Sequence, residues 1–513
     1  MNYLRNLLFF KKKIPKKWIF LIIFGLISIK LLRVYRNKPW KLLPFINKRI
    51  TQAVIEIKTK NKIEIDTLNN IVKDTFNIET SILPENGLDN ETLIKYIETL
   101  KTHDTKYKLI SGAMYDNKNE HQHIMMEAYN EFAYSNPMHG DIYNSIVFME
   151  RNIINIISNL LDNNNISCGT ITNGGTESLF LAVKTYRDLN KSKYPNLIVP
   201  DTFHCSIDKI CHYLCVSVIK IKTNDEHRVS LSDILKNIND NTICIMLSAP
   251  SYGYGIMDNV FEIAPILDKY NIPVHVDACL GGFIWMFQEI GKNYSFNIRG
   301  VTSISICLHK YGYSHKGVSS IIYREERYLK YQYFSTDDWD GGFYVSPSFL
   351  GSRSGGLVAQ AWAGLLSRGN KYYYKSSTDI INLSVYTYNK LLNNRYITSL
   401  FPRDLHIVSF SIGKNTYQLY DYLADKGFIL NALQNPAAIH ICITLQHTKE
   451  LIDELCNEIY MFISKNHSNT LVLKEGLAPI YGMKSGIPLY SSPIMNACLK
   501  IYLSSKYTSH IKK

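Results

Sequence analysis

From about residue 165 the chain alternates short β-like runs with stretches of helical apolar spacing, and this order constrains the fold most. The β-like runs are rich in β-branched residues and cover residues 166–172, 196–200, 215–221, 242–248, 273–277, 302–306 and 318–323. Helical spacing marks the stretches between several of them, at residues 176–190, 231–238 and 260–270. Strands joined by helical crossovers pair in parallel, so the sequence predicts an α/β domain around a mainly parallel sheet.

The order of elements changes after about residue 370. Residues 405–412 and 439–445 have the β-like pattern, and residues 417–425 and 449–463 have helical spacing. This order is typical of a smaller C-terminal α+β domain. We therefore expect a basic N-terminal segment, a helical connecting segment, a large α/β domain and a small α+β domain, at residues 1–50, 51–110, 111–370 and 371–513.

The positive charge of the chain is confined to its N-terminal end. The formal net charge is +13, but residues 1–50 hold 13 of the 57 lysines and arginines and no acidic residue. The rest of the chain therefore has 44 basic residues against 44 acidic ones and is neutral. An enzyme that acts on nucleic acid needs its basic surface on the folded body. The charge distribution thus argues against nucleic acid as a partner and favours a membrane surface.

One apolar run lies within the basic segment. Residues 18–29 are uncharged, but the run is shorter than the about 17–25 residues of a membrane-spanning helix. Lysines at both ends can extend it by snorkelling, so we predict a short membrane anchor. The alternatives are an interfacial helix and a cleaved signal peptide. No small-residue cleavage site supports the signal peptide, because the first alanine of the chain is Ala53.

The ten cysteines are scattered along the sequence. None forms a Cys-x-x-Cys pair or a cluster with the spacing of zinc ligands, so no metal site is predicted. We expect reduced and mostly buried thiols, which is the pattern of a protein that faces the cytosol.

A glycine-rich turn follows the first β-like run of the predicted sheet. The segment Asn173-Gly174-Gly175-Thr176-Glu177-Ser178 ends this strand and opens a predicted helix. Glycine lets backbone amides approach an anion closely, and a helix N-terminus offers unpaired N–H groups. The segment therefore predicts an anion site, although a simple glycine turn with a helix cap explains the same residues.

Three reactive side chains follow other predicted strands, and ligands of open α/β sheets bind outside the carboxyl ends of strands. Asp277 can keep a pyridine nitrogen protonated, or it caps a helix. Lys310 can form an imine with an aldehyde, and its burial is expected to lower its pKa; a surface lysine is the alternative. His204 can stack on a cofactor ring, or it is a satisfied core histidine.

These four elements follow one another in a single order along the chain, each near the end of a strand. With this order the chain resembles the group II pyridoxal-phosphate decarboxylases. The resemblance covers residues 111–483. It rests on Tyr134-Ser135-Asn136-Pro137-Met138-His139, Gly174-Gly175-Thr176-Glu177-Ser178, Val276-Asp277-Ala278-Cys279-Leu280-Gly281-Gly282, Gly300-Val301-Thr302-Ser303-Ile304-Ser305, His309-Lys310-Tyr311-Gly312-Tyr313, Asp338-Trp339, Gly351-Ser352-Arg353 and Ile480-Tyr481-Gly482-Met483. It implies the aminotransferase-type fold (fold type I), a homodimer with active sites at the dimer interface, and pyridoxal 5'-phosphate as cofactor.

The resemblance also implies roles for single residues at the cofactor. Lys310 carries the cofactor as a Schiff base, Asp277 pairs with the pyridinium nitrogen, and His204 stacks on the ring. The remaining cofactor-binding residues, which include those at its phosphate, are Gly174, Gly175, Thr176, His309 and Ser352, the last reaching in from the partner subunit.

On the substrate side, the resemblance is closest to the branch of lyases that cleave phosphorylated sphingoid bases. It implies retro-aldol cleavage of the C2–C3 bond into a long-chain aldehyde and phosphoethanolamine. The residues that grip the substrate phosphate are Tyr115, Asn136, His139 and Lys316. A catalytic tyrosine is expected at Tyr254, with Tyr252 as the second candidate.

Two other functions stay open at the level of sequence: an amino-acid decarboxylase of the same fold, and a membrane-tethered protein with a relic, inactive pocket. The implied location is the endoplasmic reticulum or another internal membrane, with the catalytic domain facing the cytosol. Two positions depart from the family pattern. Ile306-Cys307-Leu308 stands where the family has Ala-Asp-Thr, and Gly140 follows His139 where proline is common. The first departure leaves the packing around Lys310 undecided.

Deleting residues 1–50 tests the assignment of the basic segment. Because this segment holds all the net charge, the shortened chain is expected to fold, to stay in solution without detergent and to turn over detergent-dispersed substrate. Gel filtration and an activity assay measure this. Loss of folding on deletion would show instead that the segment belongs to the core.

Overall fold

The computed structural model describes residues 65–78, 83–116, 119–161 and 167–465, together with Lys500 and Leu503. Residues from Tyr107 to Leu471 group into one unit by their contacts, and the described residues before Tyr107 belong to another. That other unit contains a helix over residues 65–76 and α4 (Asn90–Thr102). The side chain of Asp89 caps α4 by accepting a hydrogen bond from the Thr92 amide at 2.8 Å.

The predicted membrane anchor, at residues 1–50, lies outside the described residues. Among the helices that the structure does describe, none is long and apolar enough to cross a membrane.

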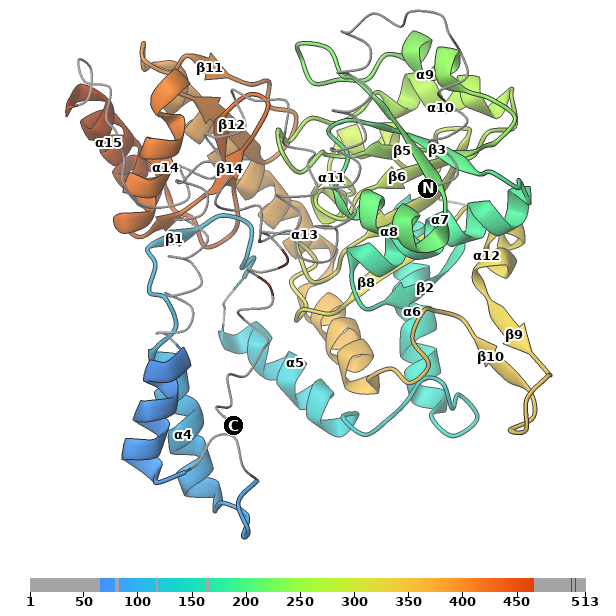
Figure 1. Cartoon of the computed structure of the whole chain (residues 1–513), viewed down its shortest axis with the longest axis horizontal. Coiled ribbons are helices and arrows are strands. Elements are labelled where there is room, and N and C mark those ends of the chain that lie inside the picture. Colours follow the sequence, from blue (N-terminus) through green and yellow to red (C-terminus); the bar gives the residue numbers. More distant parts are fainter. Residues whose placement is uncertain are drawn as a thin grey trace, which may run out of the picture. The chain divides into compact units, whose positions relative to one another are not determined.

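A seven-stranded sheet organises the larger unit, with the order β2-β8-β7-β6-β5-β3-β4 (Figure 1). Its strands are β2 (Cys168–Thr172), β3 (Asn196–Pro200), β4 (Ser217–Ile221), β5 (Thr242–Ser248), β6 (Val274–Asp277), β7 (Val301–Ile306) and β8 (Ser319–Tyr323). Only β8 runs antiparallel to its neighbours, β2 and β7, while the other pairs are parallel. The prediction of an α/β fold with a mainly parallel sheet is confirmed.

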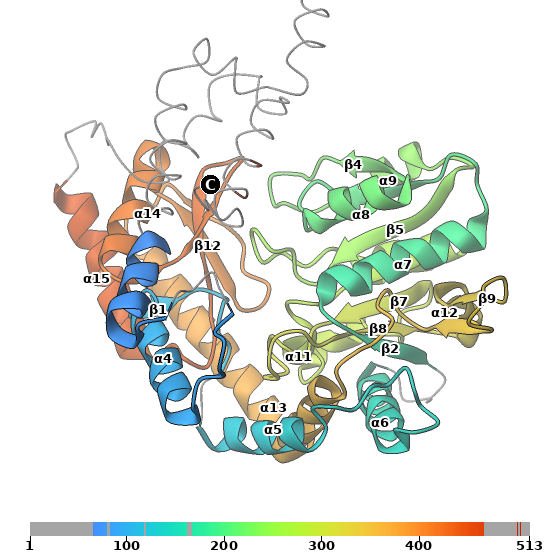
Figure 2. The ribbon, with the colours of Figure 1, turned by 60° about the horizontal axis from the view of Figure 1, so that its bottom comes forward.

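Helices cover both faces of this sheet, which is why its strands read as nearly continuous apolar runs (Figure 2). One face packs Leu197, Val199 and Ile243 with α7 (Gly175–Asn190), α8 (Ser206–Leu214) and α12 (Glu326–Gln332). The other face packs Ile198, Ile245 and Val276 with α6 (Asn144–Leu161), α10 (Val260–Asp268), α11 (Gly282–Trp285) and α13 (Gly355–Leu392). The alternation of side chains along each strand thus separates two apolar cores.

The C-terminal part of the larger unit contains an antiparallel sheet with the order β11-β12-β15-β14. Its strands are β11 (Ser399–Leu400), β12 (Ile407–Ser411), β14 (Asn431–Leu433) and β15 (Ala438–Cys442), accompanied by α14 (Thr416–Asp425) and α15 (Lys449–Lys465). The long helix α13 leads into this part and kinks at Gly369, whose φ is 65°. The predicted division at residue 370 coincides with the kink, but it stays a prediction because contacts join both sides into one unit.

The remaining elements connect these layers. They are β1 (Leu109–Ile110), α5 (Asn119–Glu131), α9 (Leu231–Asn237), β9 (Phe334–Thr336), β10 (Tyr344–Ser346) and β13 (Phe428–Ile429), with two short 3₁₀ turns at Glu289–Asn293 and Gly413–Asn415. β1 pairs in parallel with β13, so the chain entering the larger unit is tied to its C-terminal part. β9 and β10 form an antiparallel hairpin just before α13.

Candidate active site

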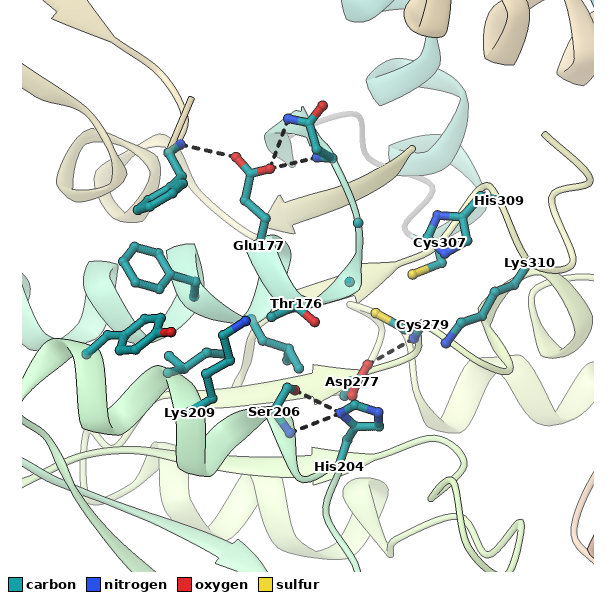
Figure 3. A pocket seen from close by; sticks show the side chains of 18 of the residues that line it. Thr176, Glu177, His204, Ser206, Lys209, Asp277, Cys279, Cys307, His309 and Lys310 are labelled. Carbon is teal, nitrogen blue, oxygen red and sulfur yellow. Dashed lines mark hydrogen bonds between the residues drawn. The ribbon is translucent and has the colours of Figure 1, made fainter. Parts of the chain in front are cut away.

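A cavity of about 500 Å³ lies at the carboxyl ends of the central strands (Figure 3). The segments that follow β2, β3, β6 and β7 all contribute to its lining. This is where a parallel sheet collects ligand-binding residues. The structure brings the following predicted cofactor residues to its wall: Gly174, Gly175, Thr176, His204, Asp277, His309 and Lys310.

The glycine turn forms one wall of the cavity. A Cβ atom on Gly175 would lie 2.8 Å from the Cys279 sulfur and 3.0 Å from the Cys307 sulfur, so no larger residue fits there. Gly174 has a φ of 146°, which also favours glycine. The turn opens α7, whose first amides have no partner within the helix. Thr176 lines the cavity, whereas Ser178 is buried and hydrogen-bonds Thr172 at 2.7 Å.

Glu177 braces this turn from behind (Figure 3). Its Oε2 accepts hydrogen bonds from the Asn173 backbone amide at 2.7 Å and from the Asn173 side chain at 3.0 Å. Its Oε1 accepts one from the Phe349 amide at 3.1 Å. One carboxylate therefore fixes the turn and ties it to the loop after β10, which supplies Phe349 and Leu350 to the cavity wall.

Asp277 is held by one oxygen and presents the other. Its Oδ1 accepts hydrogen bonds from the Cys279 amide at 3.0 Å and from the Ser305 hydroxyl at 3.2 Å. Among the residues that the structure describes, none donates a hydrogen bond to Oδ2. Asp277 is only 9% exposed, yet it lines the cavity. A buried carboxylate with an open acceptor requires a donor or cation from a ligand.

His204 faces the same space from the segment after β3. Its Nδ1 pairs with the Ser206 hydroxyl at 2.8 Å, which fixes the ring orientation. Burial lowers the pKa of His204, and the opposing effect of Asp277 is smaller. The imidazole is therefore neutral at physiological pH, which suits an aromatic ring that stacks on another.

Lys310 extends into the cavity from the turn after β7 (Figure 3). Burial disfavours its charge, but the nearby Cys307, Cys279 and Asp277 outweigh burial and raise the pKa of Lys310. Burial by itself lowers this pKa, as expected, but the net shift is upward, because the pairing of β6 with β7 brings Asp277 and Cys279 close to the amine in addition to Cys307. Its neighbour His309 hydrogen-bonds the Val318 carbonyl at 2.7 Å, and burial lowers the pKa of His309 to about 4.

The two candidate tyrosines have different surroundings. Tyr254 is buried, stacks on the His227 ring at 3.8 Å and donates its hydroxyl to the Asn435 carbonyl at 3.0 Å. It does not line the cavity. The Tyr252 ring packs edge-on against His204, with ring centres 6.0 Å apart, and is 45% exposed. Tyr252 does not line the cavity either, but it contacts His204. The first choice, Tyr254, contacts His227 and Asn435 instead.

The four residues predicted for the substrate phosphate fall into two groups. Lys316 Nζ lies 4.6 Å from the centre of the Tyr115 ring, and Tyr115 packs against Tyr311, the residue after Lys310. Partial burial and the charge of Lys310 lower the pKa of Lys316. This first group is therefore a cation next to the reactive lysine.

The second group lies around Asn136. The Asn136 side chain donates to the Ser352 hydroxyl at 3.1 Å and accepts from the backbone amides of Met138 and Arg353, each at 3.1 Å. Ser352 does not line the cavity of its own chain. Within the described part of the chain, no hydrogen bond or ion pair joins His139 or Asn136 to Tyr115 or Lys316.

A profile of the pyridoxal-dependent decarboxylase conserved domain matches residues 98–412. The chain belongs to this family. It is 34% identical over 466 residues to sphingosine-1-phosphate lyase 1 of Rattus norvegicus, covering 88% of this chain and 81% of the relative. It is 36% identical over 419 residues to sphingosine-1-phosphate lyase of Dictyostelium discoideum, covering 79% of each. A solved sphingosine-1-phosphate lyase of Burkholderia pseudomallei superposes with a TM-score of 0.70 at 26% identity, over 76% of this chain and 97% of that one.

Pyridoxal phosphate is the cofactor of this member of the family, and the cavity fits it in three respects. The open oxygen of Asp277 is an acceptor for a protonated ring nitrogen. The glycine turn opens α7, whose first backbone amides can bind a phosphate. Lys310 provides an amine within the same cavity. The fold prediction of the aminotransferase type agrees with the family.

The sequence did not single out several residues of this decarboxylase-family site. Ser206 and Lys209 line the cavity from the start of α8, directly after His204. Phe349 and Leu350 reach it from a loop far along the chain, for which the sequence holds no signal. Cys279 and Cys307 lie within noted motifs, but only the register of β6 with β7 brings them together.

The two tyrosines can be distinguished by removing one hydroxyl at a time. Tyr252→Phe is expected to lower turnover by about 10²-fold or more, the usual contribution of a positioned acid–base group, with an unchanged cofactor spectrum. Tyr254→Phe is expected to cost about 0.5–1.5 kcal/mol of unfolding free energy and to leave turnover nearly intact. Steady-state kinetics and urea unfolding measure both effects. The reverse pattern would return the catalytic role to Tyr254.

Proposed function

We propose that this protein cleaves the C2–C3 bond of a phosphorylated sphingoid base, which yields a long-chain aldehyde and phosphoethanolamine. The observation that carries the proposal is the Lys316–Tyr115 pair, which places a cation for the substrate phosphate beside the cofactor-binding lysine. The names of the relatives support the same reaction.

Each residue of the cofactor pocket has a distinct task in this proposal. Bound pyridoxal phosphate withdraws electrons from the carbon that bears the substrate amine. The Asp277 carboxylate holds the proton on the ring nitrogen, and the His204 ring fixes the plane of the cofactor. The amides of Gly175 and Thr176 bind the phosphate. Lys310 would hold the cofactor through its amine before the substrate binds.

Proton transfers follow from the surroundings of Tyr252 and Lys310. Tyr252, as a phenolate, would take the proton of the substrate C3 hydroxyl and become a neutral phenol, while the C2–C3 bond breaks and the aldehyde forms. The released Lys310 amine carries a proton because its pKa is raised. It delivers this proton to C2, which completes phosphoethanolamine.

The substrate phosphate selects which bond breaks. A charged group held by Lys316 would fix the direction of the bonds around C2, and this orientation would select the C2–C3 bond for cleavage. The cation–π contact with Tyr115 in turn positions the Lys316 ammonium. A decarboxylase of the same fold has the same requirement for Lys310, Asp277 and His204, but not for a phosphate grip.

We also propose a homodimer with shared active sites, in which Asn136, His139 and Ser352 of one subunit complete the site of the other. Within the described part of one chain, the Asn136 side chain bonds to Ser352, and Ser352 does not line the cavity of its own chain, which supports the proposal. Large apolar side chains nearby are strongly exposed, among them Tyr134 at 98% and Phe349 at 64%. Exposed aromatic residues of this kind mark interaction surfaces.

The N-terminal segment attaches the enzyme to an internal membrane in this proposal. Its 13 basic residues and single apolar run support attachment. The nine cysteines of the described residues are all free thiols, which supports a catalytic part that faces the cytosol.

The role of Lys310 can be tested by attaching the cofactor to it irreversibly. Reduction of the holoenzyme with borohydride is expected to attach the cofactor to Lys310 permanently, because the amine lies in the cofactor cavity. Peptide mass mapping locates the label. Lys310→Ala should lose both the label and turnover, while Lys209→Ala, which changes another lysine of the cavity wall, should keep the label. A label on any lysine other than Lys310 contradicts the assignment.

The phosphate grip separates the lyase from a decarboxylase. Lys316→Ala is expected to lower kcat/KM for a phosphorylated sphingoid base by roughly 30- to several-thousand-fold, since truncating one partner of a desolvated charge pair costs about 2–5 kcal/mol. The cofactor absorbance should stay unchanged. Lys236→Ala, an exposed lysine paired with Asp233, serves as the control. An unchanged kcat/KM of the Lys316 variant, or release of CO₂ from an amino acid, would contradict the proposal.

A further inference from the structure

Two thiols share the floor of the cofactor cavity. Cys279 and Cys307 both line it, and they are 7% and 2% exposed. Both sulfurs approach the same point, since a Cβ on Gly175 would lie within 3.0 Å of each. Figure 3 shows the two side chains pointing toward one another. The Cys279 thiol donates to the Ser305 hydroxyl at 3.4 Å and the Cys307 sulfur pairs with the Ser319 hydroxyl at 3.3 Å, and neither sulfur exchanges a proton with the substrate in the proposed reaction.

The sheet brings the segments that carry the two cysteines side by side. Asp277 pairs with Ser305 in the parallel register of β6 and β7, so Cys279 and Cys307 each come two residues beyond a matched pair. The ladder continues past the strand end, because the Ala278 amide donates to the Ser305 carbonyl at 2.9 Å. Neighbouring strands lie about 4.8 Å apart, within the roughly 4.4–6.8 Å between the Cα atoms of bridged cysteines.

The two sulfurs differ in reactivity. Burial opposes ionisation of Cys307, but hydrogen bonds from Cys279 and Ser319 and the charge of Lys310 outweigh it, and the pKa of Cys307 falls to about 7. The pKa of the Cys279 thiol is raised, because it also interacts with Cys307 and is buried. The pair therefore contains an attacking thiolate and a thiol that can resolve the product.

We propose that Cys279 and Cys307 are an oxidation site of the cofactor-free enzyme, which a hydroperoxide converts into a reversible disulfide that hinders cofactor loading. In the first step the Cys307 thiolate attacks hydrogen peroxide. An S–O bond forms, the O–O bond breaks, and the released hydroxide takes a proton to become water. Cys307 is then a sulfenic acid, oxidised by two electrons that the peroxide has accepted.

The second step consumes no further oxidant. The Cys279 sulfur attacks the sulfenic sulfur, the S–S bond forms, and the S–O bond breaks. The departing hydroxide takes the Cys279 proton and leaves as the second water. Two thiols and one peroxide thus give one disulfide and two waters, and a dithiol reductant reverses the change.

The bridge acts on cofactor loading through the residues that it joins. The Cys279 amide donates to Asp277 Oδ1 at 3.0 Å, so a shift of Cys279 moves the carboxylate that binds the ring nitrogen. Cys307 lies three residues before Lys310, and its thiolate is one of the charges that raise the pKa of this lysine. A bound cofactor in turn covers both sulfurs, because they form part of the wall it contacts.

Mass mapping of the full-length protein tests the proposal. Trypsin cleaves after Lys269, Lys292, Arg299 and Lys310, so the two cysteines fall in separate peptides. Cofactor-free and cofactor-loaded samples are treated with hydrogen peroxide, blocked with iodoacetamide and digested. We expect the bridged peptide pair in the cofactor-free sample and at least tenfold less of it in the loaded sample. Recovery of cofactor absorbance after adding pyridoxal phosphate should be at least tenfold slower for the oxidised sample, and dithiothreitol should restore it.

Two variants make the result specific. Cys307→Ser keeps a hydroxyl toward Ser319 but cannot form the bridge, so its cofactor loading should be insensitive to peroxide. Cys215→Ser removes an exposed thiol outside the cavity and should behave like the unchanged protein. The proposal would be overturned if iodoacetamide still alkylated both Cys279 and Cys307 after peroxide treatment. So would a bridge that forms without slowing cofactor loading, or equal oxidation of the loaded enzyme. None of these readouts depends on which substrate is cleaved.

Discussion

The parallel pairing of β6 with β7 is the constraint on which the site depends. Its register sets Asp277 opposite Ser305, and the Ser305 hydroxyl then holds one carboxylate oxygen while the other stays open to the cavity. The segments beyond both strands carry Cys279 and Lys310 to the same edge. The glycine turn can close against this edge only because Gly175 has no side chain. A change of register by one residue would turn every one of these groups to the opposite face.

At this edge of the sheet, the ionised forms of Lys310 and of its acidic neighbours are favoured over their neutral forms. A lysine buried alone would lose its proton, but Cys307, which ionises readily, and the Asp277 carboxylate lie near Lys310, and their negative charge raises its pKa instead. The histidines nearby respond in the opposite direction, since burial lowers the pKa of His204 and holds that of His309 near 4. The two histidines are therefore neutral, and the proton lies on the Lys310 amine. This amine is also the group that must bind and release the cofactor.

The parts of the site that follow strands could be predicted from sequence, because β-like runs are recognisable and ligands bind at their carboxyl ends. Asp277, His204, Lys310 and the glycine turn belong to this class, and all line one cavity. The choice between Tyr252 and Tyr254 depends on the path of a loop, in which Tyr254 turns away to the Asn435 carbonyl. The raised pKa of Lys310 depends on neighbours from another strand.

Cys307 connects the departure from the family pattern with the chemistry of the site. The resemblance places an aspartate at this position, which would supply a permanent negative charge near the lysine. A thiol with a pKa of about 7 supplies this charge only in part, and only while the sulfur is reduced. Oxidation to a disulfide removes the charge altogether, so the protonation of Lys310 becomes sensitive to the redox state of its surroundings. The substitution of one acid by a weaker one therefore keeps the electrostatic design of the pocket and adds a dependence on oxidants that a carboxylate does not have.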